Sequence, residues 1–438
     1  MHALANALAT TELIGRTGNV VAVRGHIVEA NGPAAQIGER CRIEASRSGE
    51  SIEAEVVGFN RGITVLMPLG SLEGISVGER VLALGHLPSV PIGRELLGRV
   101  IDAFGRAVDD GESLVTTERR SLRAEPLKAM QRGRVNTPLE TGVRVIDSML
   151  TLARGQRVGL FSGSGVGKST LMGMMARGTH ATVNVIALIG ERSREVREFV
   201  EDQLGTQGLA RSVVIVATAD EPAVVRSKAA YAATTIAEYF RDQGEHVLML
   251  MDSLTRFAMA RREIGLAVGE PPTARGYTPS VFAELPQLCE RSGPGAGAGT
   301  ITGVYTVLVE GDDMNEPVSD TLRATLDGHI LLSRDIANAG QYPAVDVLQS
   351  VSRLHTAIGK PADLAAARRL LAGCALYERN RQLIEIGAYK AGVSGSLDRA
   401  VRLMPKIREF FSQPLGHRSA RADSLAQLGK LAAQLEAE

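Results

Sequence analysis

The sequence predicts three parts: a small N-terminal β module, an α/β core with a mostly parallel sheet, and a C-terminal helical domain. Short apolar runs broken by glycine fill residues 17–93, strand-like runs alternate with helical stretches up to about residue 360, and helical patterns follow. A length of 438 residues suits two or three domains. We therefore expect domains at 1–93, 94–360 and 361–438.

The first part reads as an all-β module, a sandwich or a barrel, because runs such as "GNVVAVRGHIVEANG" and "GITVLMPLG" are separated by glycine-rich turns. An oligonucleotide-binding barrel would need a basic groove and stacking aromatic side chains. Residues 1–93 instead contain seven arginines and no lysine against nine glutamates, and Phe59 is their one aromatic residue. A scaffold or ring-forming barrel is therefore favoured.

The middle part contains the apolar runs "RVGLF", "VNVIALIG", "VVIVATA", "HVLMLMD" and "TGVYTVLVEG", joined by amphipathic segments. Nearly continuous apolar strands of this kind indicate a parallel sheet with helices on both faces. Ligands of such sheets bind at the carboxyl ends of the strands. The last part is helical, and Leu425, Leu428, Leu431 and Leu435 fall near one face of its final helix.

Composition excludes several classes of protein. The net charge is zero, aromatic residues make up 4% and tryptophan is absent, so neither a nucleic-acid binder nor a polybasic membrane anchor is indicated. Cys41, Cys289 and Cys374 are far apart and form no C-x-x-C pair, which predicts buried reduced thiols. No signal peptide or long apolar segment is evident. We expect a cytoplasmic protein that reaches a membrane only peripherally, through partners.

The stretch "FSGSGVGKST" at 161–170 departs from the phosphate-loop pattern G-x-x-x-x-G-K-[ST] at its first position, where Ser162 replaces glycine. Its context still supports a phosphate loop, because a strand-like run precedes it and a helical run, "KSTLMGMMARG", follows. Ser162 sits at the strand end, where a side chain can point away from a nucleotide. The alternative is a glycine-rich turn without a ligand.

Glycines in this loop let successive backbone N–H groups converge on phosphate oxygens, and the helix N-terminus adds positive charge. Lys168 is expected to bridge the β- and γ-phosphates of ATP, and the Ser169 hydroxyl to bind Mg²⁺. The predicted nucleotide-binding residues are Gly163, Ser164, Gly165, Val166, Gly167, Lys168, Ser169 and Thr170.

Two carboxylates follow apolar strands and are candidates for the chemistry. Asp252 ends "VLMLMD", which places a carboxylate near the Mg²⁺ of a phosphate loop, although a strand-end or helix-capping aspartate is the alternative. Glu191 follows "VIALIG" and is positioned to activate an attacking water, although a glutamate standing alone is more often a surface charge.

Seven stretches together resemble the type III secretion ATPase family: "FSGSGVGKST", "IGERSREVREF", "MLMDSLTRFAMARREIG", "GEPPTARGYTPSVFAELPQLCERSG", "LVEGDDMNEPVSD", "LDGHILLSR" and "QYPAVDVLQSVSRL". That family comprises the flagellar export ATPase and its injectisome counterparts, which are relatives of the catalytic subunits of rotary ATP synthases. The resemblance covers essentially the whole chain. It implies a RecA-like P-loop core, ATP hydrolysis with Mg²⁺, and the role of an ATPase coupled to protein secretion.

The resemblance also implies roles for single residues. Glu191 matches the catalytic glutamate, Arg192 a residue near the γ-phosphate, and Asp252 the Mg²⁺-site aspartate. Tyr342 matches the aromatic residue that packs on adenine, which suits a purine face, although a half-buried core tyrosine is the alternative. Arg353 matches the arginine that reaches the nucleotide of a neighbouring subunit, where the alternative is a salt-bridge or solvent-facing residue.

The implied partners follow from the same resemblance. The family forms a homohexamer, and the positions of "GEPPTARGYTP" line the ring centre, where a stalk-like coiled-coil subunit contacts it. Its C-terminal domain faces the export gate and engages secretion substrates and their chaperones, and a stator-like regulator binds an N-terminal extension. Only about 16 residues precede the predicted barrel here, so the stator-binding residues stay unassigned. The expected location is cytoplasmic, peripheral to the inner-membrane export apparatus.

The leading interpretation is therefore an ATPase ring that energises export through a flagellar type III apparatus, with an injectisome ATPase as the alternative. A catalytic subunit of a rotary ATP synthase is disfavoured by "VEGDDMNEPVSD" and "GEPPTARGY". The acidic, aromatic-poor N-terminal part disfavours an RNA translocase. Glu191 argues against a nucleotide-binding subunit without catalytic activity.

Overall fold

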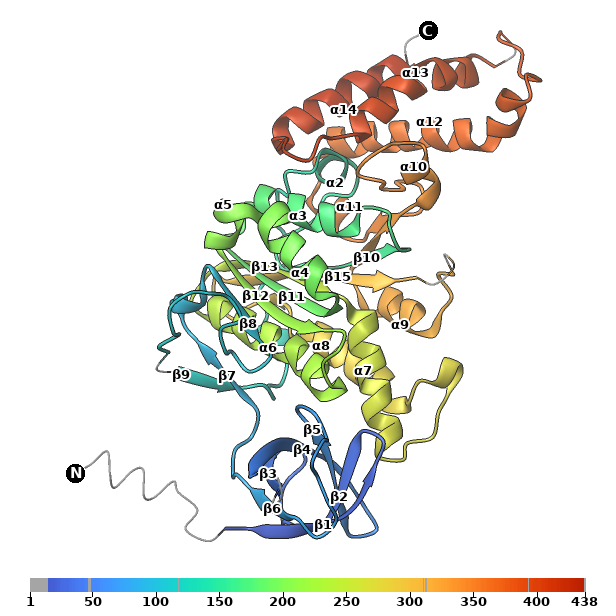
Figure 1. Ribbon diagram of the computed structural model, residues 1–438. Helices are drawn as coiled ribbons and strands as arrows, with labels where there is room; N and C mark the ends of the chain where they lie inside the picture. Colours follow the sequence, from blue (N-terminus) through green and yellow to red (C-terminus); the bar gives the residue numbers. More distant parts are fainter. Residues whose placement is uncertain are drawn as a thin grey trace.

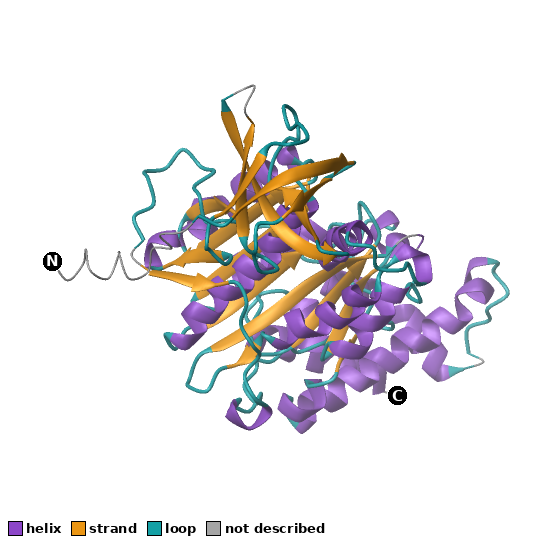
Figure 2. Cartoon of the chain, turned by 90° about the horizontal axis from the view of Figure 1, so that it is seen from below, coloured by secondary structure: helices purple, strands orange, loops and turns teal. Residues whose placement is uncertain are grey.

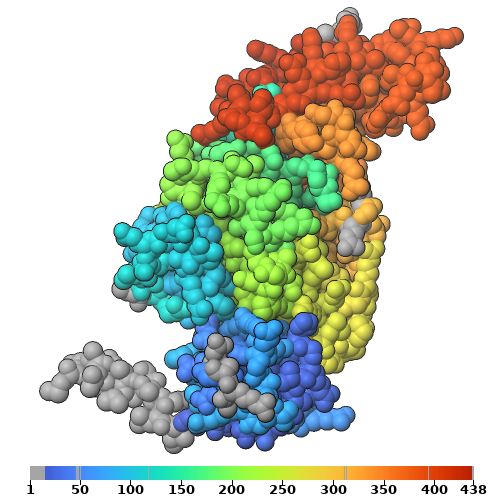
Figure 3. Space-filling model, viewed as in Figure 1, coloured from blue at the N-terminus to red at the C-terminus, as the bar shows by residue number. Residues whose placement is uncertain are grey.

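The computed structural model describes residues 15–45, 49–116, 118–309, 311, 313–392 and 394–436 (Figure 1). Three units are stacked along the molecule: a β-barrel at one end, an α/β unit in the middle and a helical unit at the other end (Figure 3). The predicted fold class is thus confirmed. The segment before the barrel, on which contacts with a stator would depend, lies outside the described residues.

The barrel closes because its first and last strands pair with each other. Alternate side chains of each strand face inward, as a period of two requires, so that in β3 the side chains of Cys41, Ile43 and Ala45 are buried. Phe59 is half exposed and lies outside this core. The strand order is β1 (Thr17–Arg24), β2 (Ile27–Asn31), β5 (Ile63–Pro68), β4 (Glu50–Asn60), β3 (Arg40–Ala45) and β6 (Arg80–Ala83).

The middle unit is built on a nine-stranded sheet that is parallel from β16 to β8. The strand β17, at one end of this path, pairs antiparallel with β16, and β14, which lies off the path, pairs antiparallel with β15. The order is β17 (Val351–Ser352), β16 (Gly328–Leu332), β10 (Arg157–Ser162), β15 (Thr300–Leu308), β13 (His246–Asp252), β11 (Val183–Glu191), β12 (Ser212–Thr218) and β8 (Arg99–Asp102), with β14 (Gly293–Pro294) beside β15.

Both faces of this sheet are buried, which explains the nearly continuous apolar runs of its strands. In β11, Val185 and Ala187 pack into the cluster under the helices α6, α7 and α8, whereas Ile186 and Leu188 pack into the cluster under α3. The helices of this unit are α2 (Arg144–Met149), α3 (Lys168–Gly178), α4 (Ser193–Glu198), α5 (Gly205–Ala210), α6 (Ala223–Asp242), α7 (Leu254–Ala267), α8 (Pro279–Glu290), α9 (Pro317–Thr325), α10 (Arg334–Asn338) and α11 (His355–Ile358).

Three long helices lie together near the C-terminus (Figure 2). They are α12 (Pro361–Glu385), α13 (Gly395–Phe411) and α14 (Arg421–Glu436). Their apolar side chains share a core with the α/β unit. As the leucine spacing predicts, Leu428 is buried, and Leu425, Leu431 and Leu435 pack beside it. The helical unit is therefore fixed to the sheet by apolar contacts, and α14 packs against α2.

Short elements connect the barrel with the sheet. Strands β7 (Ser89–Ile92) and β9 (Glu118–Ser121) pair with each other, so β7 lies outside the barrel although it belongs to the stretch 1–93. The remaining short helices are η1 (Arg94–Leu96), η2 (Ala129–Gln131), η3 (Phe199–Leu204) and η4 (Ala274–Gly276).

A buried ion pair holds the barrel to the sheet unit. The Lys228 ammonium on α6 lies 2.6 Å from the Glu55 carboxylate on β4, and both side chains are about nine-tenths buried. Nearby, the Arg123 guanidinium donates to the Ile37 carbonyl oxygen over 2.8 Å. Since charges in such a place are costly unless paired, this contact fixes one orientation of the barrel.

All three cysteines are buried and free, as expected. Burial is the main cause that raises the pKa of each of these thiols to about 12. The thiols are therefore uncharged and unreactive near neutral pH. Among the described residues, no helix combines the length and the apolar character that a bilayer-spanning segment needs.

A second buried pair allows a test of how the sheet unit is held together. The Arg291 guanidinium donates to both carboxylate oxygens of Glu238 at 2.9 and 2.6 Å, and both side chains are buried. Glu238→Ala leaves that guanidinium buried without its carboxylate and is expected to lower the free energy of unfolding by about 3–5 kcal/mol. The matched change Glu385→Ala removes an exposed pair with Arg381 and should cost about 1 kcal/mol or less. Urea denaturation followed by circular dichroism measures both, and equal costs would contradict this account.

Candidate functional site

The loop after β10 has the geometry of a phosphate cradle. Gly165 and Gly167 adopt positive φ angles of 77° and 87°, and α3 begins at Lys168 directly after Gly167. Left-handed backbone of this kind favours glycine and turns the following N–H groups toward the helix N-terminus. Ser164 and Gly165 are exposed, whereas Gly163 and Val166 are buried. The loop therefore presents its backbone to solvent at the carboxyl end of the sheet.

The serine at the first position of the loop is buried in the protein. Its hydroxyl oxygen has no hydrogen-bond partner among the described residues, and its carbonyl oxygen accepts from the backbone of Val309 at 3.0 Å. Ser162 is thus part of the strand. Glycine at this position is not required by the observed backbone, because Ser162 has an ordinary strand conformation.

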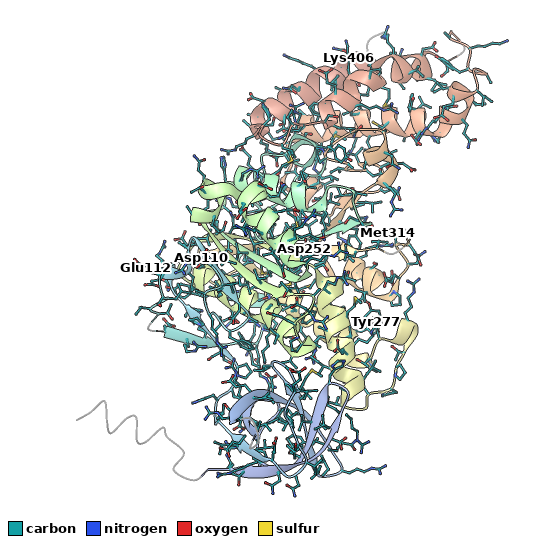
Figure 4. All side chains as sticks on the ribbon, in the orientation of Figure 1. Asp110, Glu112, Asp252, Tyr277, Met314 and Lys406 are labelled. Atoms are coloured by element: carbon teal, nitrogen blue, oxygen red, sulfur yellow. The ribbon has the colours of Figure 1, made fainter. Side chains whose placement is uncertain are left out.

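Three charged side chains meet at the start of α3. The Lys168 ammonium lies 2.6 Å from Oδ1 of Asp252 and 3.5 Å from Oε1 of Glu191. Asp252 is the last residue of β13, and Glu191 is the last residue of the neighbouring parallel strand β11. Figure 4 labels Asp252 in the middle unit of the molecule. The sheet therefore brings Lys168, Glu191 and Asp252 together as the sequence predicts.

The surroundings of these groups set their charges. Burial, and next the negative charge of Asp252, raise the pKa of Glu191 to about 7, against the opposing effect of Lys168. Burial acts to lower the pKa of Lys168, but the charges of Asp252 and Glu191 prevail and raise it. The hydroxyl of Thr306 donates to the same Asp252 oxygen over 2.6 Å. Lys168 is consequently charged near neutral pH, while Glu191 titrates in that range.

One arginine at this site was missed by the sequence analysis. Arg256 stands in the first turn of α7, four residues after Asp252, and its Nε is buried without a hydrogen-bond partner in the described part of the chain. A β-carbon on Gly190, directly before Glu191, would come within 3.1 Å of the Arg256 side chain. The signal was present, because a helix that starts directly after a strand-end aspartate places its first turn beside the same edge of the sheet.

Other predicted residues lie on the rim of the loop. Tyr342 is about 43% exposed, and its ring carbons Cδ1 and Cε1 would be 3.4 and 3.5 Å from a β-carbon on Gly167. Its ring therefore flanks the loop, where a flat base could rest on it. Ser169 is exposed and Thr170 is half-buried in the first turn of α3.

Two predicted residues are not brought to the charge cluster within this subunit. The Arg192 side chain is more than four-fifths exposed and pairs with Glu195 at 3.4 Å. Arg353 follows β17 at the margin of the sheet, is exposed, and donates to the carbonyl oxygen of Arg323 at 3.1 Å. Its guanidinium thus lies at the surface and does not enter the interior of its own subunit.

The residues present fit a nucleotide with its magnesium ion. A buried lysine at a helix start and an arginine with an orphaned nitrogen match the charge of phosphate groups. Among the described residues, no group of three or more acidic, cysteine or histidine side chains could hold a metal alone. Mg²⁺ needs no such group, since it takes one or two protein oxygens together with phosphates and water. Ser169 and Asp252 offer those oxygens.

Family models match the chain in three consecutive stretches. The beta-barrel domain of the ATP synthase alpha/beta family matches residues 20–85, and the nucleotide-binding domain of that family matches residues 142–352. The T3SS EscN ATPase C-terminal domain matches residues 360–430. These stretches correspond to the barrel, the sheet unit and the helical unit described above.

Relatives match nearly the whole chain. The flagellum-specific ATP synthase of Bacillus subtilis is 50% identical over 98% of both chains, and the type 3 secretion system ATPase of Xanthomonas euvesicatoria is 48% identical over 97% of this chain and 96% of its own. The structure of the assembled ATPase EscN from the enteropathogenic E. coli type III secretion system covers 95% of this chain and all of its own, with a TM-score of 0.90 and 41% identity. Since likeness of this degree runs from the barrel to the last helix, the chain belongs to the flagellar and type III secretion ATPase family.

Proposed function

We propose that this chain hydrolyses ATP in a ring of six copies and energises protein export through a flagellar type III apparatus. The observation that carries the proposal is the meeting of Lys168, Glu191 and Asp252 beneath an exposed phosphate loop. A structural ion pair would not need a half-buried glutamate with a pKa near 7 beside a loop of left-handed glycines. Membership of an ATPase family supports the same conclusion.

Each side chain of the cluster has a separate task in the proposed reaction. Lys168 and the loop N–H groups bind the β- and γ-phosphates, and Arg256 neutralises further phosphate charge. Asp252 and Ser169 would hold Mg²⁺, which supplies charge neutralisation when bound. Glu191, when ionised, accepts a proton from the attacking water and orients it toward the γ-phosphate. Tyr342 supports the adenine ring.

The isolated subunit has Arg353 outside this group, and we propose that a neighbouring copy supplies it. An arginine that arrives in trans stabilises the charge that develops during phosphoryl transfer. The exposed position of Arg353 at the margin of the sheet suits that role, because it can reach outward without unfolding anything. Arg192 is also exposed, and its approach to the γ-phosphate would require release from Glu195.

The ring and its partners extend this proposal. A structure similar to this chain, with a TM-score of 0.86 and 40% identity, shows EscN in complex with its central stalk EscO. The loop with η4 carries Arg275, which pairs with Asp313 at 2.7 Å and is half exposed, and we assign this loop to the ring centre and a stalk-like subunit. Export gate, substrates, chaperones and a stator-like regulator remain proposed partners at the two ends of the molecule.

An injectisome ATPase is the second candidate. The Xanthomonas relative and the EscN structures favour it, whereas relatives named flagellum-specific from Bacillus subtilis and Treponema pallidum, both 50% identical, favour the flagellar role. The two candidates share the reaction and differ in the exported proteins.

Replacement of Glu191 by glutamine tests the reaction. Glu191→Gln keeps the shape of the side chain but cannot accept a proton, so turnover should fall by about 10²–10⁴-fold while ATP binding is retained. Glu198→Gln, on the exposed surface of α4, serves as the matched control and should retain full activity. Wild-type turnover in the Glu191→Gln protein would refute the role of general base. In cells, loss of flagellar protein secretion by this variant supports the leading candidate, and loss of injectisome secretion supports the second.

The titration of Glu191 predicts a dependence of activity on pH. A carboxyl with a pKa of about 7 is protonated and inactive as a base below that value, so kcat/KM should rise with pH through about 7 and level off above it. As a control, the affinity of the Glu191→Gln protein for ATP is measured over the same range of pH. Any change in this affinity reports titration of the nucleotide and not of Glu191. A flat kcat/KM profile from pH 6 to 8, with flat binding, would contradict the assignment.

If a neighbouring subunit supplies Arg353, the ATPase activity should depend on assembly of the subunits. The specific ATPase activity of the wild type should rise with protein concentration, whereas Arg353→Ala should stay low at every concentration, reduced by about 10³–10⁵-fold. Arg334→Ala, an exposed arginine on the nearby α10, is the control and should behave as wild type. Specific activity that is constant down to monomer concentrations would show that one subunit suffices.

A further inference from the structure

A polar cavity of about 360 Å³ lies at the seam between the sheet unit and the C-terminal helices. His180 on its wall follows the C-terminal end of α3, whereas Lys168 starts that helix, so about 16 Å of helix separates the cavity from the phosphate loop. The polar side chains of the wall are those of Glu140, Arg154 and His180 on the sheet side and of Lys360, Asp363 and Arg421 on the helical side.

Three cations on this wall, Arg154, Lys360 and Arg421, have no close ion-pair partner among the described residues. The Nε atoms of Arg154 and Arg421 are both buried and have no hydrogen-bond partner in the described part of the chain. Neither these two guanidinium groups nor the Lys360 ammonium takes part in an ion pair with a described carboxylate. By contrast, Arg241 and Arg291, whose side chains are buried, are paired with Asp242 and Glu238. Two orphaned guanidinium nitrogens in one cavity therefore indicate a missing anion.

The acidic side chains of the wall do not neutralise this charge. Glu140 lies 3.7 Å from His180 and 3.5 Å from Arg418, so its charge is already shared with two partners. Asp363 is the other carboxylate of the wall and stands in the first turn of α12. The wall therefore holds three cations against two carboxylates, and Arg418 beside Glu140 adds a further positive charge.

Two helices begin at the same place. Lys360 is the N-cap residue of α12, which has 25 residues, and Arg421 is the first residue of α14, which has 16. The free N–H groups and the dipole of each helix start add partial positive charge, which is the environment that binds phosphate. Both α12 and α14 belong to the helical unit in Figure 1.

The pKa of the nearby His355 is consistent with a positive electrostatic potential at this cavity. Nδ1 of His355 is buried without a hydrogen-bond partner among the described residues. Burial lowers the pKa of His355, and the charges of Arg421 and Arg368 lower it further. An uncharged histidine beside uncompensated arginines is what a site without its anion should show.

We propose that this cavity binds an oxyanion of the phosphate class, inorganic phosphate or pyrophosphate, which Arg154 and Arg421 hold between them. Guanidinium groups from two separate units would then grip one ligand and tie the helical unit to the sheet. The seam also reaches the nucleotide loop, because the backbone N–H of Gln413 donates to the carbonyl oxygen of Tyr342 at 2.8 Å. Binding of an anion in the cavity is therefore expected to reduce the mobility of the segment around Gln413, to which the backbone of Tyr342 is bonded.

Titration calorimetry of the full chain with pyrophosphate and with phosphate tests this site at constant ionic strength in chloride buffer. The parent protein carries Lys168→Ala, so that the phosphate loop does not hide the second site. Arg154→Gln and Arg421→Gln, each made separately in this parent, should weaken binding by about tenfold because each removes a charged hydrogen-bond donor. Lys430→Gln, an exposed lysine on α14 that lies outside the cavity, is the control and should leave binding unchanged.

Circular dichroism checks that each variant is folded. Because the two arginines are replaced in separate proteins, the test still works if one of these variants does not fold. Tighter binding of pyrophosphate would identify a diphosphate ligand, tighter binding of phosphate a single phosphate, and either supports the proposal. The absence of binding to the parent at millimolar concentration would overturn it. Equal affinities of the parent, the arginine variants and the control would overturn it as well, because the anion would then bind elsewhere.

Discussion

The buried charge of Lys168 is the constraint on which the site depends. An ammonium group removed from water requires a negative partner at all times, and Asp252 at 2.6 Å provides it in the subunit alone. A nucleotide phosphate can take over that role, which frees Asp252 for a metal ion. Binding of the substrate and release of Asp252 are therefore one electrostatic event.

The parallel sheet explains how this event can be transmitted. Glu191 and Asp252 end adjacent strands, the phosphate loop follows β10, and Arg353 follows the margin strand β17. Tyr342 flanks the loop with its ring, and its carbonyl oxygen accepts a hydrogen bond from the backbone N–H of Gln413 in the helical unit. A chain of neighbouring groups thus runs from the phosphate loop to the helical unit, whereas the barrel is held on the opposite side of the sheet unit by Lys228 and Glu55.

The sequence allowed the local features of the site to be predicted, because each depends on neighbours along the chain. The glycine loop with Lys168, and the two carboxylates that end apolar strands, need only strand and helix patterns. Arg256 could not be predicted in the same way, since its role depends on which strand ends lie side by side. The exposed position of Arg192 depends on a side-chain pairing with Glu195. The buried pair of Lys228 and Glu55 joins distant segments, which periodicity does not connect.

The central claim is that two subunits build one reaction site, with Lys168 from one and Arg353 from the other. The most direct measurement is an experimental structure of the assembled ring with Mg²⁺ and a non-hydrolysable ATP analogue. We predict that the γ-phosphate contacts Lys168 of its own subunit and the Arg353 guanidinium of the adjacent one, with Glu191 facing the position of the attacking water. An Arg353 that stays bonded to Arg323 of its own chain at every nucleotide-filled interface would contradict it.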